Sequence, residues 1–269
     1  MSAAHIWRAR PLLGTMVTIQ LNTPECERAH TAIEDAFKVI EKIQTLMSAH
    51  HASSDLGLIS RAQSGDKLSI HPWTHEVIGL AQHWFHQSGG AFDPCRAARQ
   101  LQRPGLAPQA DGNVSDVVLL SDEKVLIQQP VMLDFGGIAK GYAVDKAVEH
   151  LQQLGLTDGV VDAGGDMRAW GIGYASCEVR HAQRVLRDQR LRKRLKLHNQ
   201  AVATSVAAPT NPEFVKSLNR RLTWRSATVL APDCVTADAL TKWALQSSLL
   251  CPELGKILRQ YKAKMWRSE

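Results

Sequence analysis

Two glycine-rich turns flanked by acids contain the residue types of a phosphate-binding site. In the first, residues 133–145 (Leu-Asp-Phe-Gly-Gly-Ile-Ala-Lys-Gly-Tyr-Ala-Val-Asp), a glycine pair, a lysine and a further glycine lie between two acids. The second, residues 162–166 (Asp-Ala-Gly-Gly-Asp), follows a short apolar segment. Glycine lets the backbone approach a bulky ligand, and the amides at a helix start, with a nearby lysine, can hold a phosphate. The pattern predicts a site for a phosphate-bearing cofactor.

Neither turn matches a common nucleotide-binding motif. The sequence contains no G-x-x-x-x-G-K-[ST] Walker loop and no G-x-G-x-x-G dinucleotide fingerprint. Glycine pairs also occur in ordinary structural turns, so either turn alone is weak support for a ligand site. The two turns in this order, with the acids and the lysine in place, favour the cofactor interpretation.

The arrangement resembles the FAD:protein FMN transferase (ApbE) family, whose members carry D-x-G-G-I-A-K-G-x-x-x-D followed by [ND]-A-G-G-D. Further segments extend the resemblance over most of the chain. They are residues 13–16 (Leu-Gly-Thr-Met), 47–50 (Met-Ser-Ala-His), 54–56 (Ser-Asp-Leu), 89–94 (Gly-Gly-Ala-Phe-Asp-Pro), 203–205 (Ala-Thr-Ser) and 236–240 (Thr-Ala-Asp-Ala-Leu). The resemblance implies attack of a Thr or Ser hydroxyl of a partner flavoprotein on FAD, which attaches FMN to that protein and releases AMP.

The resemblance also assigns residues to FAD contact. They are Leu13, His50, Ala91, Phe92, Asp93, Asp134 and Lys140. It places Lys140 near the phosphates and His50 where the family often has an aromatic residue that stacks on a ring. Taken alone, Lys140 could be an ordinary surface charge, and His50 could be an exposed loop residue.

The implied reaction needs a metal that neutralises phosphate oxygens, and Mg²⁺ takes oxygen ligands. By resemblance, the ligands fall on the carbonyl of Gly137 and on Asp238, which could otherwise be a helix-start acid. The family's threonine position falls on Lys242, one residue after Thr241. One helical step rotates a side chain by about 100°, so Thr241 is a candidate ligand but no automatic substitute. Two interpretations stay open: the Lys242 ammonium replaces the cation, or metal binding is weakened or lost.

A second departure from the family concerns a histidine held to matter for the transfer. The family carries H-I-[IV]-[DN]-P-x-T-G between the A-T-S strand and the next strand. Here residues 209–216 read Pro-Thr-Asn-Pro-Glu-Phe-Val-Lys, and no histidine follows His198. No catalytic residue is therefore assigned, and an FAD-binding protein without transferase activity is the alternative function.

Composition limits the setting in which the chain works. The five cysteines are dispersed and form no C-x-x-C pair, which argues against a zinc site or a disulfide framework and favours reduced thiols in the cytoplasm. No apolar run reaches the roughly 18 residues of a membrane span. The first residues lack the apolar core of a signal peptide.

The net charge of +6 is concentrated in one basic run. Residues 180–196 contain six Arg, two Lys and one Asp, a net charge of +7. Such a run could bind nucleic acid, which makes a nucleic-acid-binding module a third class of function. No aromatic residues are interleaved for base stacking, and residues 195–197 alternate as in an exposed strand. We therefore expect a solvated strand pair and no nucleic-acid binding.

Helices and strands are expected in an irregular order. Apolar periodicity and capping residues predict helices at residues 28–47, 74–87, 141–154, 235–247 and 252–261. Thr236 or Asp233 is a possible cap of the fourth helix. Strands are predicted at residues 17–21, 159–161 and 227–230, with two more within 114–127. The lack of a regular βαβ alternation favours an α+β fold. With the resemblance, we expect one ApbE-like domain over residues 1–269, with mixed or antiparallel sheets and packed helices.

Overall fold

The computed structural model describes residues 4–96, 110–173, 175–178, 194–206, 224–248 and 250–268. The chain divides into two compact units. Unit 1 is drawn from Met1–Glu41 and Lys140–Glu269, and unit 2 is Lys42–Ala139. Both combine helices with antiparallel sheet, which confirms the α+β class. That the whole chain forms one domain stays a prediction.

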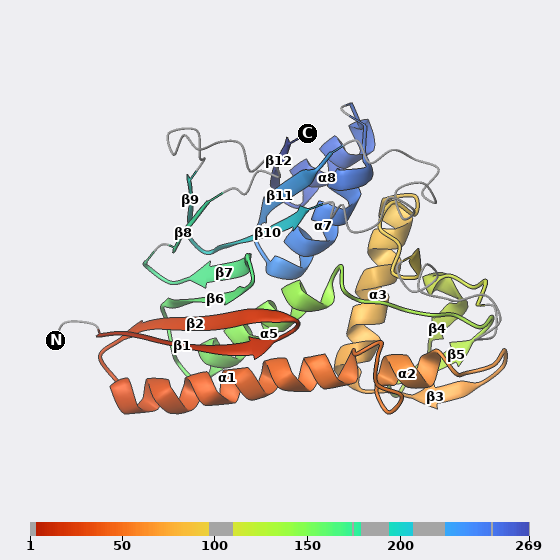
Figure 1. Ribbon diagram of the computed structural model, residues 1–269, viewed down its shortest axis with the longest axis horizontal. Coiled ribbons are helices and arrows are strands. Elements are labelled where there is room, and N and C mark those ends of the chain that lie inside the picture. Colours follow the sequence, from red (N-terminus) through yellow and green to blue (C-terminus); the bar gives the residue numbers. More distant parts are fainter. Residues whose placement is uncertain are drawn as a thin grey trace. The chain divides into compact units, whose positions relative to one another are not determined.

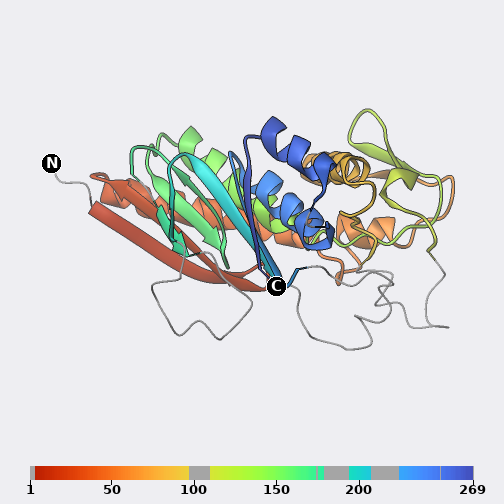
Figure 2. The same ribbon diagram turned by 90° about the horizontal axis from the view of Figure 1, so that it is seen from above.

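A seven-stranded sheet forms the centre of unit 1 (Figure 1). Its strands are β1 (Ala4–Leu12), β2 (Thr15–Thr23), β6 (Gly159–Ala163), β7 (Asp166–Trp170), β10 (Gln200–Val206), β11 (Ser226–Ala231) and β12 (Lys264–Ser268). They lie side by side in chain order, and every neighbouring pair is antiparallel. Figure 2 shows the twist that accumulates from strand to strand. A separate two-stranded sheet joins β8 (Ala175–Glu178) to β9 (Arg194–Leu197).

The three strands predicted in this part of the sequence are present as β2, β6 and β11. On β2 the side chains of Val17, Ile19 and Leu21 are fully buried and alternate with more exposed neighbours, as the two-residue period of a strand requires. The edge strands β1 and β12 were not predicted. Most of the basic run, residues 180–193, lies outside the described residues, and its last residues belong to β9.

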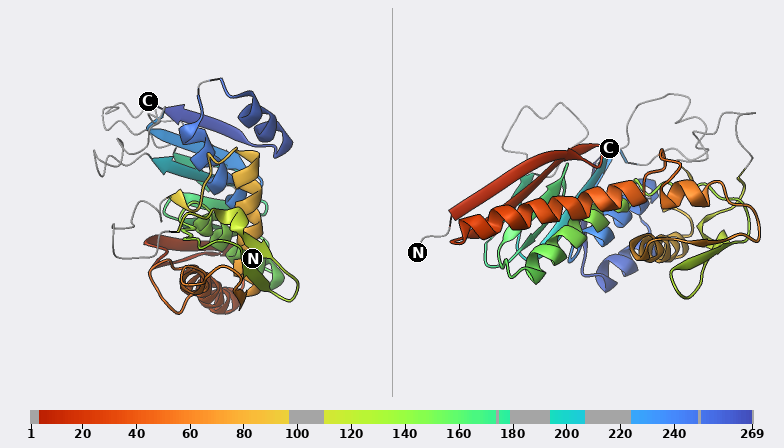
Figure 3. Two further views of the ribbon diagram at one scale, coloured as in Figure 1. Left: turned by 90° about the vertical axis from the view of Figure 1, so that its right-hand side faces the viewer. Right: turned by 90° about the horizontal axis from the view of Figure 1, so that it is seen from below.

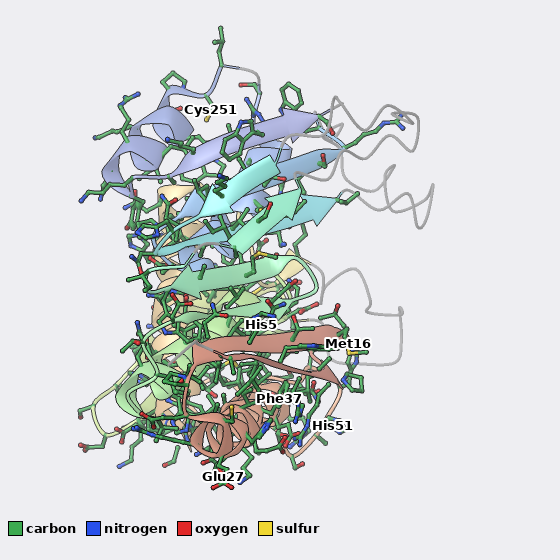
Figure 4. The ribbon with its side chains drawn as sticks, turned by 90° about the vertical axis from the view of Figure 1, so that its left-hand side faces the viewer. His5, Met16, Glu27, Phe37, His51 and Cys251 are labelled. Atoms are coloured by element: carbon green, nitrogen blue, oxygen red, sulfur yellow. The ribbon has the colours of Figure 1, made fainter. Side chains whose placement is uncertain are left out.

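Unit 1 contains α5 (Ala139–Gln153) almost entirely, α7 (Cys234–Gln246), α8 (Pro252–Gln260) and the first part of α1 (Cys26–Leu46). All four helices were predicted, with ends that shift by one or two residues. Figure 3 shows α1 running along the β1–β2 hairpin. Phe37 points from α1 towards these strands (Figure 4), and the guanidinium carbon of Arg10 on β1 lies 4.8 Å from its ring centre. The helix α7 packs on β10 and β11.

Unit 2 is smaller and is built around α3 (Pro72–Gln87). It also contains α2 (Asp55–Ile59), the 3₁₀ helix η1 (Val114–Asp116), and a three-stranded antiparallel sheet in the order β3 (Lys67–Ser69), β5 (Lys124–Ile127), β4 (Val117–Leu119). The two strands predicted within residues 114–127 are β4 and β5, preceded by the capped turn η1. Among the helices that the structure describes, none has the length and apolar character needed to cross a membrane.

Candidate functional site

The lysine of the first glycine turn lies in a buried group of charges in unit 1. The Lys140 ammonium is bonded to Oδ2 of Asp166 and lies 3.6 Å from Oδ2 of Asp238. The backbone N–H of Gly141 donates to the same Asp238 oxygen at 3.2 Å. Both acids are buried, Asp238 completely. The start of α5 therefore directs one ammonium and one amide at two carboxylates.

Gly141 is glycine because α5 begins directly against the start of α7. A Cβ at this position would overlap the backbone of Cys234 and Val235. The missing side chain lets the two helix starts approach closely enough for the Gly141 amide to reach Asp238.

The second glycine turn is the hairpin between β6 and β7. Gly164 and Gly165 both have positive φ, +70° and +103°, as a two-residue hairpin turn of type I′ requires. The carboxylate of Asp162 accepts the N–H of Gly165 at 2.7 Å. Asp166 begins β7 and accepts from the N–H of Thr204 on β10 at 3.2 Å as well as from Lys140. The ion pair between Lys140 and Asp166 therefore joins the two predicted turns at one place.

Helix α7 supplies the other side of the site. Asp238, Thr241 and Lys242 are spaced i, i+3, i+4 and so share one helical face. The Lys242 ammonium lies 3.2 Å from Oδ1 of Asp238 and 3.4 Å from the Thr241 hydroxyl, and it is bonded to the hydroxyl of Ser205. The hydroxyls of Ser205 and Thr241 are 2.6 Å apart. We call the six residues of this site the charge cluster: Lys140, Asp166, Ser205, Asp238, Thr241 and Lys242.

The charge cluster balances two carboxylates with two ammonium groups. Burial works against ionisation of Asp238, but the charges of Lys242 and Lys140 outweigh it and lower the pKa of Asp238 below its ordinary value. Burial and the nearby charge of Asp238 raise the pKa of Asp166, with Lys140 opposing the rise. Burial alone would lower the pKa of Lys140, but Asp238 and Asp166 raise it above its ordinary value. Lys140 and Asp238 are therefore both charged at neutral pH.

The last acid of the first motif positions α7. The Asp145 carboxylate accepts the N–H groups of Cys234 and Val235 at 2.9 and 2.8 Å, and Arg168 donates to it at 2.8 Å. These N–H groups belong to the first turn of α7, where the helix has no partners of its own for them. Burial nevertheless raises the pKa of Asp145 to about 6. Asp233, one of two predicted caps, accepts from Thr236 N at 2.8 Å and completes this helix start.

An open cleft of about 310 Å³ lies beside the second glycine turn. It is lined by Asp162, Gly164, Gly165, Met167, Ser176, Cys177, Val202, Thr204 and Val206. Thr204 connects the cleft to the charge cluster, because its N–H is bonded to Asp166. Burial, reinforced by the charge of Asp162, raises the pKa of the Cys177 thiol to about 11, so this cysteine is a neutral wall residue at physiological pH.

Four of the residues assigned to FAD by resemblance lie together in unit 2. Asp134 donates its backbone N–H to the carbonyl of Pro94 at 2.8 Å, which ties it to the segment of Ala91, Phe92 and Asp93. The carboxylates of Asp93 and Asp134 accept the N–H groups of Cys95 and Gly136 at 2.9 and 2.7 Å. Phe92 is buried, and its backbone N–H donates to the Ser88 hydroxyl at 2.8 Å. Contact of these residues with FAD stays a prediction.

The remaining assigned residues belong to different units. Leu13 lies in unit 1, at the turn between β1 and β2, with φ of +54°. His50 is exposed in the segment after α1. Gly137 belongs to unit 2, whereas Asp238 and Thr241 belong to unit 1, so their joint role as metal ligands stays a prediction.

The oxygens around Lys242 test whether the Mg²⁺ implied by the resemblance suits this chain. One carboxylate and two hydroxyls converge here, a donor set that a hard cation takes. The Lys242 ammonium already lies among these oxygens, and Oδ2 of Asp238 is engaged by Lys140 and Gly141. A second cation does not fit this set while Lys242 holds its position, because like charges repel.

Sequence reasoning did not select Ser205, Asp166 or Lys242 as site residues. Asp166 ended the second motif and Ser205 ended the A-T-S segment. Lys242 was a departure from the family, with replacement of the cation by its ammonium as one of two open interpretations. The i, i+4 spacing of Asp238 and Lys242 is a local signal for their contact. The separation of Asp166 and Ser205 from Asp238 in the sequence gives no such signal. Residues 209–216, where the family histidine would be expected, lie outside the described residues.

Comparisons with known proteins agree on one family. A model of the ApbE family matches residues 13–248. The chain is similar to the FAD:protein FMN transferase of Treponema pallidum (strain Nichols), with 26% identity over 200 residues, or 66% of this chain and 55% of that protein. The chain thus spans little more than half the length of that relative. It is also 23% identical over 270 residues to the FAD:protein FMN transferase of Vibrio cholerae serotype O1, covering 88% of this chain and 80% of that one.

Solved structures show the same fold. The flavin transferase ApbE from Vibrio cholerae matches with a TM-score of 0.78 and 18% identity, covering 99% of this chain and 98% of that one. The ApbE protein from Thermotoga maritima matches with a TM-score of 0.78 and 20% identity, covering 99% and 97% of the two chains.

Proposed function

Because the chain belongs to the ApbE family, we propose that it is a FAD:protein FMN transferase. Two relatives that carry this name support the proposal. The observation that carries it is the ion pair between Lys140 and Asp166, which joins the two family motifs into one charged site.

In the proposed reaction, the oxygen of an acceptor Thr or Ser hydroxyl forms a bond to the phosphorus of the FMN half of FAD. The bond from that phosphorus to the bridging oxygen breaks, AMP leaves with the bridging oxygen, and the hydroxyl proton is released. The charge that develops on the phosphate oxygens needs fixed positive charge and N–H donors nearby. We assign no catalytic base.

The charge cluster suits the binding of a diphosphate. Lys140 and Lys242 are each a little over a quarter exposed, so both ammonium groups combine buried partners with a surface that a phosphate can reach. Their partners, Asp166 and Asp238, hold them in place before any ligand arrives. Positive charge that is already oriented costs little reorganisation when phosphate binds.

Three finer parts of the proposal rest on the resemblance. FAD is the proposed substrate, and the proposed partner is an acceptor flavoprotein. Mg²⁺ is implied by the resemblance alone, and the contacts of Lys242 with the oxygens of Asp238, Thr241 and Ser205 argue against it. A cytoplasmic location also stays a prediction, and the five free cysteines are consistent with it.

A transfer assay tests the proposed function. Purified protein and FAD are added to an extract of the source cells from which the gene has been deleted. We expect AMP release, measured by chromatography, and a new protein band with covalent flavin fluorescence that survives denaturation. The Asp238→Asn variant should give neither signal, because one lysine of the cluster loses its charged partner.

The outcome separates the transferase from the alternative function. The wild-type protein could bind FAD but give no AMP release and no covalent flavin, however much extract is added. That result would favour a flavin-binding protein without transferase activity. Absence of FAD binding in calorimetry would contradict both.

A further inference from the structure

Lys242 occupies the position in which a cation would sit. Its ammonium contacts a carboxylate oxygen of Asp238 and the hydroxyl oxygens of Thr241 and Ser205, which come from α7 and from β10. Three oxygens that converge on one point form a cation site whatever the cation is. An ammonium with three N–H donors is matched to three acceptors.

The position of Lys242 follows from the local geometry of α7. Lys242 is four residues after Asp238, and at this spacing a lysine folds back along the helix onto the carboxylate. Thr241, at i+3, presents its hydroxyl on the same face, and its O–H donates to the Asp238 carbonyl at 2.7 Å. Ser205 closes the set from β10, because α7 packs on that strand.

Charge balance argues against an additional metal ion. The two carboxylates of the charge cluster are matched by two ammonium groups, and both oxygens of the fully buried Asp238 have partners. A divalent ion would add two positive charges beside Lys140 and Lys242 in a poorly solvated place. Lys242 would have to leave before the metal could bind.

We propose that Lys242 is a built-in cation that takes the place of a divalent metal at Asp238, so that the charge cluster works without one. The inference rests on the proposed function for what the cluster does with a phosphate-bearing substrate. The exclusion of metal at Asp238 is a property of the protein alone and can be measured without FAD.

Manganese titration tests the proposal, with the electron paramagnetic resonance signal of free Mn²⁺ as the readout. We expect no binding at Asp238 in the wild-type protein. The Lys242→Thr variant should bind one Mn²⁺ at least about 100-fold more tightly, because the repelling charge is removed and a hydroxyl is supplied. The added Asp238→Asn change should abolish that binding.

A matched control shows whether the loss of any lysine next to an acid is enough to create a Mn²⁺ site. Lys38 pairs with Asp35 at 2.8 Å on the surface of α1, with 70% of its side chain exposed. Lys38→Thr also frees a carboxylate and lowers the net charge by one, and it should leave Mn²⁺ binding as in the wild type. Circular dichroism confirms that each variant is folded, and Lys242→Gln replaces Lys242→Thr if the latter is not.

Two results would overturn the proposal. One is tight Mn²⁺ binding by the wild-type protein that disappears in Asp238→Asn. The other is a folded Lys242 variant that gains no binding dependent on Asp238. FAD affinity measured with and without EDTA gives a separate readout: we expect no change in the wild type, and a protein that binds no FAD would contradict the proposed function but not the metal result.

Discussion

At the residue scale, two lysines act as counterions for two buried acids. Asp166 and Asp238 are 3% and 0% exposed, and an unpaired carboxylate at either depth would be strongly destabilising. Lys140 contacts both acids, whereas Lys242 contacts Asp238 alone among the cluster's carboxylates. The same pairing holds both ammonium groups in fixed positions, which the proposed binding of a phosphate would use.

Replacing Lys140 tests its part in FAD binding. We expect Lys140→Ala to weaken FAD binding by about 10–100-fold, the loss of one charge-assisted contact of about 1.5–3 kcal/mol. Calorimetric titration of FAD into the wild-type protein and into Lys140→Ala measures this loss of affinity. Lys38→Ala, which removes an exposed lysine, should bind FAD as the wild type does. Equal affinity in Lys140→Ala and wild type would place FAD elsewhere.

At the element scale, the site depends on how the starts of α5 and α7 meet. Asp145 on α5 accepts two N–H groups of the first turn of α7, and Gly141 on α5 lies against the Cys234 backbone. These contacts set where Asp238 lies along α7 relative to Lys140. The helices thus position the charges, and the sheet beneath them supplies Asp166 and Ser205.

A methyl group at Gly141 should disturb this junction. Gly141→Ala forces a Cβ into the Cys234 backbone, which cannot yield as a flexible side chain does, so we expect a loss of about 1–3 kcal/mol in the free energy of unfolding. Gly255→Ala in α8 is the matched control, since the nearest atom to its Cβ is the end of Arg259 at 3.8 Å. It should raise stability by about 0.5–1 kcal/mol. Urea unfolding measures the free energy of unfolding of both variants. Equal changes in Gly141→Ala and Gly255→Ala would contradict the prediction.

Asp145 predicts a pH dependence of stability. Burial raises its pKa from 3.8 to about 6, so between these values the folded protein binds more protons than the unfolded chain. The contribution of Asp145 to stability therefore falls as the pH rises through this window and is constant above it. Relative to Asp145→Asn, which does not titrate, wild-type stability should fall by about 2–3 kcal/mol between pH 4 and pH 7. Urea unfolding of both proteins across this range measures the difference in their free energies of unfolding. A difference that does not change with pH would contradict the prediction, because it would mean that the carboxylate is already ionised at pH 4.

At the scale of the whole molecule, the positive charges are of two kinds, those paired with buried acids and those of the basic run. Lys140 and Lys242 are neutralised by buried acids, whereas the basic run accounts for the net charge of +6. A local run of like charge attracts polyanions without sequence specificity.

The basic run should therefore give no specific binding of nucleic acid. We expect fluorescence anisotropy with labelled duplex and single-stranded oligonucleotides to show at most weak binding that fades steeply with salt. Tight binding that persists near 0.15 M salt, where charges are screened beyond about 8 Å, would contradict the prediction.

Local sequence was enough for the fold class, five of the helices and the position of the glycine turn between β6 and β7. The period of apolar residues and the caps act over a few positions, so Asp233 could be identified as a possible cap and Gly164 and Gly165 as a turn from neighbouring residues alone. The strands β1, β7 and β12 of the large sheet were not predicted. A strand is stabilised by hydrogen bonds to its neighbours in the sheet, and its own composition does not show these partners.

The assembly of the charge cluster depended on packing between distant segments. Lys140 meets Asp166 and Asp238, and Lys242 meets Ser205, only because the antiparallel sheet sets β7 beside β10 and α7 lies on β10. No local pattern encodes such contacts. From the sequence, replacement of the cation by the Lys242 ammonium was one of two open interpretations. The spacing along α7 brings Asp238 and Thr241 to Lys242, and the packing of α7 on β10 adds Ser205, which only the tertiary structure decides.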